Sequence, residues 1–312
     1  MTKVPFFSVV IPLYNKEMYV KKTLETVLDQ TFTDYEIIIV DDGSKDNSCT
    51  IVKSIKDPRI RLISQDNGGP SKARNRAIRE SRGQYITFLD ADDIWLPEKL
   101  KKQYELHSRH PDLSWSCSAY EYIGGYSKQN AVFQSSVIED AIDAMVDGLS
   151  IWTGTVVIKK DVFQNERLLF NENISRSEDW ELWLKMTCLY PKIGYINEIL
   201  ASYLVNIEGS LVNTEMEETD FSFLSLRSRI DKELDSIDES RRVKIINYID
   251  RLTQNWIIGV WKKRNDFGNY TKHFQPFMGK KLLTLLNYTN SLPVTMKKMV
   301  LKVKNIYDAK IS

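Results

Sequence analysis

Short hydrophobic runs alternate with helical patterns through the first hundred residues of the chain. Four of these runs are rich in β-branched side chains and bounded by turn-forming residues, which is typical of buried parallel strands. They cover residues 7–11, 36–40, 60–63 and 85–89. We expect Pro12 to end the first of these strands.

Between the strands, hydrophobic residues recur at the three- and four-residue spacing of helices. The sequence predicts helices over residues 20–28, 51–55 and 70–81, with Pro70 in the first turn of the third. Another helix is predicted to begin at Pro97. Strands that alternate with helices form a mostly parallel sheet with helices on both faces. The predicted fold class is therefore α/β, with a Rossmann-like central sheet flanked by helices.

The second hundred residues have a mixed pattern. Residues 113–119 alternate as in a half-buried strand, residues 155–158 are another candidate strand, and residues 178–190 are predicted to be helical. In the last third, five hydrophobic residues have the spacing of a buried stripe on one long helix: Ile245, Ile249, Leu252, Trp256 and Val260. We therefore divide the chain into an α/β domain over residues 1–205 and a helical C-terminal extension over residues 206–312.

Composition and charge narrow the class of protein. The 43 Lys and Arg residues nearly balance 42 Asp and Glu, for a net charge of +1. With a net charge this small, the protein has no overall positive electrostatic field that would attract nucleic acid. We therefore expect no nucleic-acid partner. The three cysteines form no Cys-x-x-Cys pair, which argues against a disulfide framework or a zinc site. We see no secretory signal and no apolar run of membrane-spanning length, so we expect a cytoplasmic protein.

Acidic residues cluster where two predicted strands end. Asp41 and Asp42 follow one strand, and Asp90, Asp92 and Asp93 follow another. Ligands of open α/β sheets bind outside the carboxyl ends of the strands. Like charges at one edge are costly unless a cation or a hydrogen-bonding ligand is present, and Asp-x-Asp offers the oxygen ligands that Mg²⁺ or Mn²⁺ prefers. For such a tripeptide taken alone, a solvated acidic turn or a helix cap is the better interpretation.

This tripeptide is accompanied by four other segments in a fixed order. The five are SVVIPLYN (8–15), IVDDGSKD (39–46), NGGPSKARNRA (67–77), GQYITFLDADD (83–93) and SEDWELW (177–183). Together they resemble the inverting glycosyltransferases of family two, which have the GT-A fold and include bacterial surface-polysaccharide glycosyltransferases. The resemblance covers about residues 5–205. It implies transfer of a sugar from a nucleotide diphosphate donor to an acceptor hydroxyl.

The resemblance also implies roles for individual residues. Asp41 would accept the imide N–H of uracil, which favours a UDP-sugar as donor, and Asp92 would be the main ligand of Mn²⁺ or Mg²⁺. The other donor contacts would be Pro12 and Tyr14 beside the base, Asn67 and Arg74 on the nucleotide, Asp90 on ribose or donor sugar, and Asp93 on the donor sugar. For Pro12, Tyr14 and Arg74, an ordinary packing or surface role is the alternative.

An acidic pair opens the predicted helix at residue 178. In the resembling family an Asp at this place is the catalytic base, which implies that role for Asp179, with Glu178 as the fallback. The alternative is that both acids complement the helix dipole while Ser177 caps the helix. Trp152 and Trp180 are candidates for the acceptor side, because aromatic faces suit the C–H faces of sugar rings.

The C-terminal segment over residues 272–312 is basic, with eight lysines against one acid. One interpretation is peripheral contact with an anionic membrane that carries a lipid-linked acceptor, at the inner face of the cell membrane. The other is a solvated face on a helix packed against the rest of the chain. The sequence lacks the Gln-x-x-Arg-Trp motif and the membrane spans of processive synthases, so we expect one sugar per encounter with a glycan or lipid-linked glycan. A catalytically silent binding or scaffolding protein is the alternative function.

Overall fold

A computed structural model describes residues 3–124, 133–174, 176–205 and 224–263. Among them, residues 3–205 and 230–238 belong to one compact unit, and residues 224–229 and 239–263 belong to a second. The predicted division at residue 206 stays a prediction, because the residues around it lie outside the described part of the chain.

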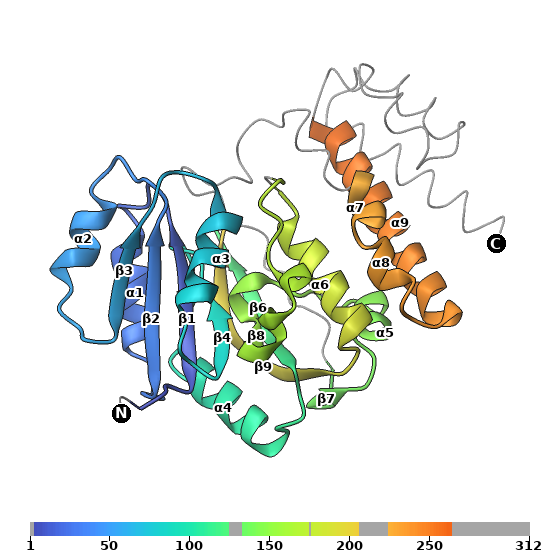
Figure 1. Ribbon diagram of the computed structural model, residues 1–312, viewed down its shortest axis with the longest axis horizontal. Coiled ribbons are helices and arrows are strands. Elements are labelled where there is room, and N and C mark those ends of the chain that lie inside the picture. The colour runs from blue at the N-terminus through green and yellow to red at the C-terminus, as the bar shows by residue number, and fades with distance from the viewer. Residues whose placement is uncertain (1–2, 125–132, 175, 206–223, 264–312) are drawn as a thin grey trace. The chain divides into compact units, whose positions relative to one another are not determined.

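The first half of the larger unit is a parallel sheet. Its strands are β1 (Phe7–Leu13), β2 (Tyr35–Asp41), β3 (Ile60–Ser64) and β4 (Tyr85–Phe88), and they lie in the order β3-β2-β1-β4 (Figure 1). All three neighbouring pairs are parallel. The four predicted strands are confirmed, and their carboxyl ends meet at one edge of the sheet.

Strand β1 differs from the prediction at Pro12. It continues through Pro12 to Leu13, and Pro12 pairs in register with Val40 of β2. The other neighbour, β4, pairs with β1 only as far as Val10, whose carbonyl accepts the amide of Leu89 at 3.0 Å. Residues two apart point their backbone groups to the same side, so Pro12 faces the side where pairing has already ended. A missing N–H costs nothing there.

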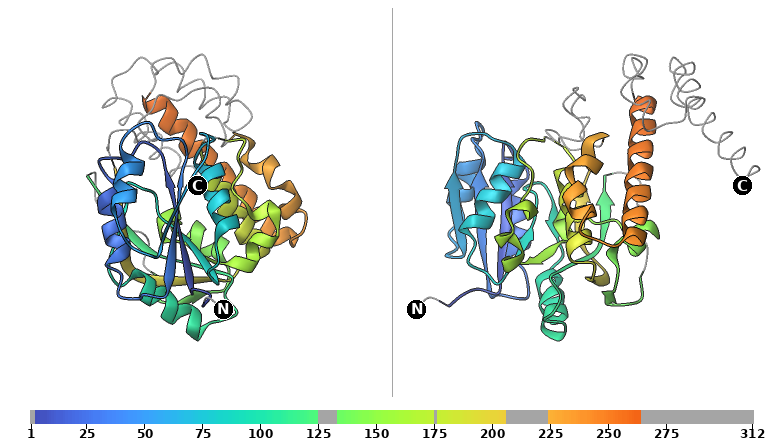
Figure 2. Two further views of the ribbon diagram at one scale, coloured as in Figure 1. Left: turned by 60° about the vertical axis from the view of Figure 1, so that its left-hand side comes forward. Right: turned by 45° about the vertical axis from the view of Figure 1, so that its right-hand side comes forward.

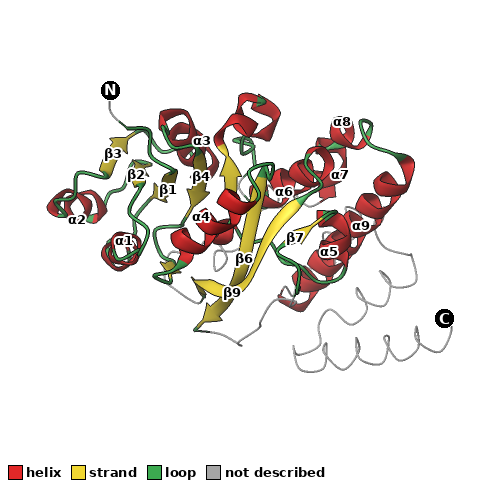
Figure 3. Cartoon of the chain, turned by 90° about the horizontal axis from the view of Figure 1, so that it is seen from below, coloured by secondary structure: helices red, strands yellow, loops and turns green. Residues whose placement is uncertain are grey.

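Helices cover both faces of this parallel half. They are α1 (Val20–Leu28), α2 (Ser48–Ser54), α3 (Pro70–Glu80) and α4 (Lys99–Arg109). Figure 3 shows α3 on one face and α1 on the other. The predicted apolar face of α1 packs into the core, and Pro70 occupies the first turn of α3 as expected. Helix α4 lies at the end of the sheet where β1 begins (Figures 1 and 2).

The sheet continues beyond β4 with mixed strand directions. Its order is β4-β8-β6-β9-β5, with β7 on β9, from β5 (Ile94–Trp95), β6 (Trp115–Ile123), β7 (Val137–Ile138), β8 (Val157–Lys159) and β9 (Ile193–Leu204). The strand predicted at 113–119 is confirmed as β6, but it is not half-buried as predicted. Strand β6 lies between β8 and β9, and Ser116 and Ser118 on its second face are also buried.

The remaining elements are mostly helical. They are α5 (Ala141–Val146), the 3₁₀ turns η1 (Thr153–Thr155), η2 (Lys160–Gln164) and η3 (Glu166–Leu168), α6 (Glu178–Leu189), α7 (Leu226–Arg229), α8 (Asp231–Leu234) and α9 (Glu239–Lys263). Within the described ranges, no helix is both long and apolar enough to cross a membrane.

Helix α9 confirms the predicted long helix but shifts its buried stripe. Ile245 and Ile249 are buried as expected, whereas Leu252 and Trp256 are only half-buried. The buried stripe continues instead through Thr253, Ile257 and Trp261. The side chain of Val260 lies outside the described residues, so its predicted place in the stripe is not tested.

Candidate active site

The end of β2 carries two buried acids with different surroundings. Asp41 accepts the Ser44 amide at 3.2 Å through Oδ1. Burial, followed by the charge and hydrogen bond of Asp41, raises the pKa of the Cys49 thiol to about 11. Asp41 therefore has local partners but also retains lone pairs for a further donor, as a uracil contact requires.

Asp42 is occupied by the protein itself. Its carboxylate accepts the side-chain amide of Gln65 at 2.7 Å and the backbone amides of Gly68 and Gly69, the latter at 2.7 Å. Its carbonyl accepts the side-chain amide of Asn67 at 3.0 Å. Asp42 thus fixes the 65–69 loop, on which Asn67 is exposed. No role was predicted for Asp42, although a second acid at this strand end is visible in the sequence.

The loop after β1 is joined to the loop after β2. The amide of Asn15 donates to Ser44 Oγ at 3.0 Å, and the amide of Lys16 donates to Ser48 Oγ at 2.8 Å. Tyr14, on the first of these loops, has 44% of its surface exposed and is free to meet a flat ligand face, whereas Pro12 is half-buried. The structure therefore brings Pro12 and Tyr14 to the same edge of the sheet as Asp41.

The acidic loop after β4 contains one acid that is paired with a lysine. Lys16 Nζ lies 2.6 Å from Asp92 Oδ2, and both side chains are 13% exposed. Burial and the neighbouring charge of Asp90 raise the pKa of Asp92, while Lys16 opposes that shift. No pattern in the sequence indicated Lys16, which lies in the third position after the strand on another loop.

Asp93 is directed into the protein. It is fully buried, its Oδ1 accepts the amide of Leu204 at 2.9 Å, and its Oδ2 has no hydrogen-bond partner. Burial, and then the charges of Asp90 and Asp92, raise the pKa of Asp93 well above its usual range. Its bond to the end of β9 fixes the acidic loop. The predicted contact of Asp93 with a donor sugar would require this loop to move.

Arg74 connects the acidic loop with α6. Its Nη2 lies 2.7 Å from Asp90 Oδ1, and its Nη1 lies 2.7 Å from Glu178 Oε1. Burial lowers the pKa of the guanidinium. The charges of Asp90 and Glu178 together raise this pKa by more than burial lowers it, so the net shift is upward. Arg74 is only 5% exposed, and its guanidinium also lies 5.2 Å from the centre of the Phe170 ring. The structure therefore gives Arg74 two carboxylate partners where the sequence predicted a nucleotide contact.

The residue after Arg74 anchors the same segment. Asn75 donates through Nδ2 to the carbonyl of Phe170 at 2.8 Å and accepts the Phe170 amide at 2.9 Å. Two successive residues of α3 therefore hold the chain that leads into α6. Through Arg74, this arrangement links Glu178 in the first turn of α6 to Asp90 after β4, although Arg74 and Glu178 are 104 positions apart in sequence.

Asp179 lies in the first turn of α6. Its Oδ1 accepts the amide of Trp180 at 2.8 Å, and its Oδ2 accepts the hydroxyl of Thr153 at 3.2 Å. Burial and the charge of Glu178 raise the pKa of Asp179 to about 6, and Arg74 opposes this rise. Ser177 occupies the cap position with φ of 63° and makes no side-chain capping bond, so the capping alternative is wrong for Ser177.

The residues present fit a hard divalent cation. Asp92 offers carboxylate oxygens, and Asp90 adds a second negative charge close by. Among the described residues, no group of three or more His, Cys, Asp or Glu side chains could hold a metal alone. Mg²⁺ is usually bound through one or two carboxylates plus substrate phosphates, so this donor set suits a cation that binds together with a nucleotide diphosphate.

The candidate acceptor tryptophans are both half-buried. Trp152 packs between Tyr120 and Tyr203, with ring centroids 5.1 and 5.2 Å away. Trp152 immediately precedes Thr153, and Trp180 immediately follows Asp179. Both tryptophans therefore adjoin the residues that contact each other at the first turn of α6.

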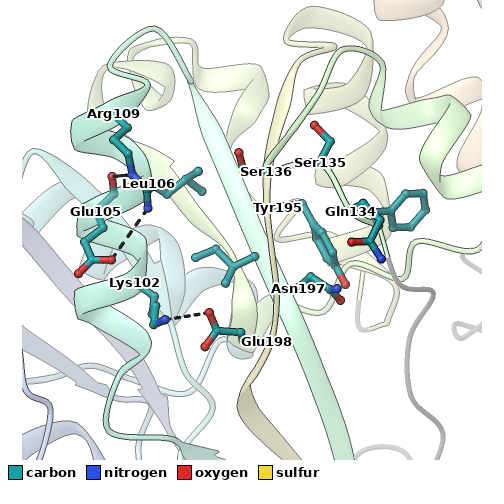
Figure 4. A pocket seen from close by; sticks show the side chains of 12 residues that line it. Lys102, Glu105, Leu106, Arg109, Gln134, Ser135, Ser136, Tyr195, Asn197 and Glu198 are labelled. Atoms are coloured by element: carbon teal, nitrogen blue, oxygen red, sulfur yellow. Dashed lines mark hydrogen bonds and ion pairs between the residues drawn. The ribbon is translucent and has the colours of Figure 1, made fainter.

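A surface pocket of about 190 Å³ lies elsewhere on this unit. Figure 4 shows its lining from α4, from residues 133–136 and from β9, including the ion pair between Lys102 and Glu198 at 2.8 Å. None of the predicted site residues lines this pocket. Because α4 lies where β1 begins, the pocket is separate from the carboxyl ends of the strands.

Comparison with known proteins agrees with this geometry. The model of the family "Glycosyl transferase family 2" matches residues 8–134, which include the ends of β1, β2 and β4. Residues 8–134 are therefore assigned to glycosyl transferase family 2. An uncharacterized glycosyltransferase of Rickettsia felis is 34% identical over 221 residues, 69% of this chain and 35% of that protein. The uncharacterized glycosyltransferase EpsJ of Bacillus subtilis is 31% identical over 213 residues, 65% of this chain and 62% of EpsJ.

A similar solved structure shows the fold of the chain. The crystal structure of S. aureus TarS residues 1–349 in complex with UDP-GlcNAc has a TM-score of 0.75 and 20% identity, and covers 96% of this chain and 91% of that chain. The GT-A fold predicted from the sequence is confirmed. The chain spans only about a third of the Rickettsia felis relative and 31% of a chondroitin synthase of Escherichia coli that is 30% identical to it.

Proposed function

We propose that this chain is an inverting glycosyltransferase that moves a sugar from a UDP-sugar to an acceptor hydroxyl. The observation that carries the proposal is the Asp90–Arg74–Glu178 bridge, which brings the first turn of α6 to the acids at the strand ends. Family membership supports sugar transfer, and the similarity to TarS, whose structure contains UDP-GlcNAc, supports a UDP-sugar donor. The similarity to EpsJ and chondroitin synthase supports a role in polysaccharide or lipid-linked glycan synthesis.

Asp179 would act as the general base. Its carboxylate takes the proton of the acceptor hydroxyl while that oxygen forms a bond to the anomeric carbon. The bond between the anomeric carbon and the diphosphate breaks on the opposite face, and the UDP leaves with the bonding electrons. A base works best when its pKa is close to the working pH, and a pKa of about 6 meets this condition near neutrality.

A divalent cation would be held by Asp92. When bound, Mn²⁺ or Mg²⁺ would neutralise the charge that develops on the leaving diphosphate. Asp41 would hold the uracil, with Pro12 and Tyr14 beside the ring, and Asp90 would contact the ribose or the donor sugar. In this arrangement Arg74 keeps Asp90 in place, and its own bonds are to protein carboxylates.

Two measurements separate an enzyme from a silent binding protein. Thermal shift with UDP-GlcNAc and other UDP-sugars, with and without Mn²⁺, reports donor binding, because a ligand of the folded state raises apparent stability. Release of UDP from the best donor, with water or added glycan as acceptor, reports catalysis. Binding without any UDP release would favour the silent alternative, and a lack of response to every nucleotide sugar would reject the donor assignment.

The membrane contact rests on residues 272–310, which lie outside the described residues. Peripheral binding at the inner face of the cell membrane would place the enzyme beside a lipid-linked acceptor. Sedimentation with vesicles rich in anionic lipid tests this contact. The proposal requires salt-sensitive binding that vanishes in neutral vesicles, whereas an unbound protein at low salt would remove the membrane interpretation.

A further inference from the structure

The carboxylate of Asp179 is held by hydrogen bonds at both of its oxygens. The backbone amide of Trp180 donates to Oδ1 at 2.8 Å, and the hydroxyl of Thr153 donates to Oδ2 at 3.2 Å. The bond from Trp180 comes from the backbone of the next residue, so it does not depend on the side chain at 180. The bond from Thr153 comes from a side chain in a different part of the chain, so it depends on the residue at 153. Thr153 is itself buried, with 3% of its surface exposed.

Thr153 opens the short turn η1, and this turn is fixed from within. The hydroxyl of Thr155 donates to the carbonyl of Trp152 at 2.7 Å, which closes the turn. The indole N–H of Trp95 donates to the carbonyl of Gly154 at 2.8 Å. The ring of Trp152 covers Gly154 so closely that a Cβ there would lie 2.5 Å from a ring carbon. With a larger residue at 154, either the Trp152 ring or the turn would therefore have to move.

Helix α4 adds a second layer of support below the turn. Lys99 Nζ and Gln103 Nε2 each lie 3.4 Å from the carbonyl oxygen of Thr155. Both side chains are fully buried, and the ammonium nitrogen of Lys99 lies 4.6 Å from the centre of the Trp95 ring. Burying an ammonium group and a side-chain amide costs free energy unless they form hydrogen bonds. Both groups bond the carbonyl of Thr155, so they hold the turn η1 in a defined position.

We infer that Thr153 is a positioning residue for Asp179, and that Trp95, Lys99 and Gln103 hold its hydroxyl in place. This inference rests on the proposed function, in which Asp179 is the base. The hydroxyl fixes the orientation of the carboxylate and stabilises its charged form. Each oxygen accepts one hydrogen bond and keeps a lone pair, so the carboxylate can still receive the proton of an acceptor.

The effect of the Thr153 hydroxyl on the pKa of Asp179 can be separated from the effects of nearby charges. The charged groups that act on Asp179 are Glu178 on its own helix, which raises its pKa, and Arg74 on α3, which lowers it. Neither is changed by a substitution at Thr153. A shift in the pKa of Asp179 in such a variant therefore reports the lost hydroxyl.

The test is a ¹³C NMR titration of the 312-residue chain labelled in aspartate carboxyls, with Asp179→Asn used to assign the signal. We expect Thr153→Val to raise the pKa of Asp179 by about one pH unit, because a hydrogen bond to a charged group is lost. Thr153→Ser, which keeps the hydroxyl, should restore the wild-type value. An unchanged pKa in folded Thr153→Val would overturn the inference.

A second variant covers the case in which valine prevents folding. Thr153→Ala removes the same hydroxyl without placing a methyl group beside the carboxylate, and the same upward shift is expected. The titration needs no donor or acceptor, so it is independent of the proposed activity. If the pKa of Asp179 shifts but no UDP-sugar is turned over, the proposed catalytic role of Asp179 is rejected. The hydrogen bond from Thr153 to Asp179 is still supported in that case. With activity present, the acid limb of kcat/KM should move upward with the pKa.

Discussion

Arg74 lies between Asp90 and Glu178, with one guanidinium nitrogen 2.7 Å from each carboxylate. This single side chain links α3 to the loop after β4 and to the first turn of α6. In the proposed enzyme it therefore connects the donor side to the base. The side chains of Arg74 and Glu178 are 6% and 11% exposed, so solvent screens their interaction only weakly.

Removing this link should destabilise the fold. Replacing Arg74 by Met leaves two carboxylates without their counter-charge, and breaking a buried ion pair costs about 3–5 kcal/mol. Urea unfolding measures the loss in free energy of unfolding. Arg76→Met is the matched control, because Arg76 is half exposed and its ion pair with Glu80 is on the surface of the same helix. Equal losses in the two variants would contradict a special role for Arg74.

Asp179→Asn should lower the rate of sugar transfer by about 10²- to 10⁴-fold, the usual contribution of a general base, with donor binding retained. The rate is measured as UDP release, and donor binding as thermal shift. Asp161→Asn, at an exposed acid in η2, is the control. Near-normal turnover in Asp179→Asn would move the role to the fallback, Glu178, which Glu178→Gln then tests.

The rate should rise with pH through a pKa of about 6, because Asp179 must be ionised to accept a proton. Arg74 lowers the pKa of Asp179, so in Arg74→Met the acid limb should move to higher pH. The measurement is kcat/KM with a UDP-sugar between about pH 5 and 8. A downward movement would show that Asp179 is not the titrating group.

Asp92→Ala should weaken donor binding only where a divalent cation contributes to it. Thermal shift by the donor should fall in the presence of Mn²⁺ and change little in its absence. Asp41→Ala is the comparison, because a uracil contact should be lost with or without Mn²⁺. If Asp92→Ala retains the full Mn²⁺-dependent shift, the cation is held elsewhere.

Lys99→Met should stabilise the protein near neutral pH. Burial lowers the pKa of Lys99 from 10.5 to about 7, so the folded state binds fewer protons than the unfolded state between these values. The contribution of Lys99 to stability is therefore lost as the pH falls from about 10 to 7. We expect Lys99→Met to raise the free energy of unfolding by about 1–4 kcal/mol at pH 7, and less near pH 10. Lys101→Met, at an exposed position, should show no such pH trend.

The sequence predicted the strands that matter for the site but not the contacts between their ends. Hydrophobic runs located β1 to β4, and the acids that follow β2 and β4 were visible as clusters. The bond between Arg74 and Glu178 spans 104 positions, and no local pattern encodes a partner at that separation. For the same reason, the pairing of Lys16 with Asp92 and the bond of Thr153 to Asp179 were missed.

Strand β9 was missed for a different reason. Its sequence places Asn197 and Glu198 at exposed positions in the middle of the strand, where the pairing with β6 shifts register, so no regular alternation marks it. The burial of Asp93 was also hidden, because an acid after a strand resembles any polar turn. Its partner is the amide of Leu204 at the end of this unpredicted strand.

The ion pair between Lys16 and Asp92 has a consequence for how the protein meets its ligands. The lysine supplies, from the chain itself, the positive charge that the acidic loop would otherwise take from solution. The ammonium group of Lys16 therefore offsets part of the negative charge of this loop. In the proposed enzyme, a divalent cation would have to compete with this ammonium group for Asp92, which would favour its arrival together with a polyanionic companion.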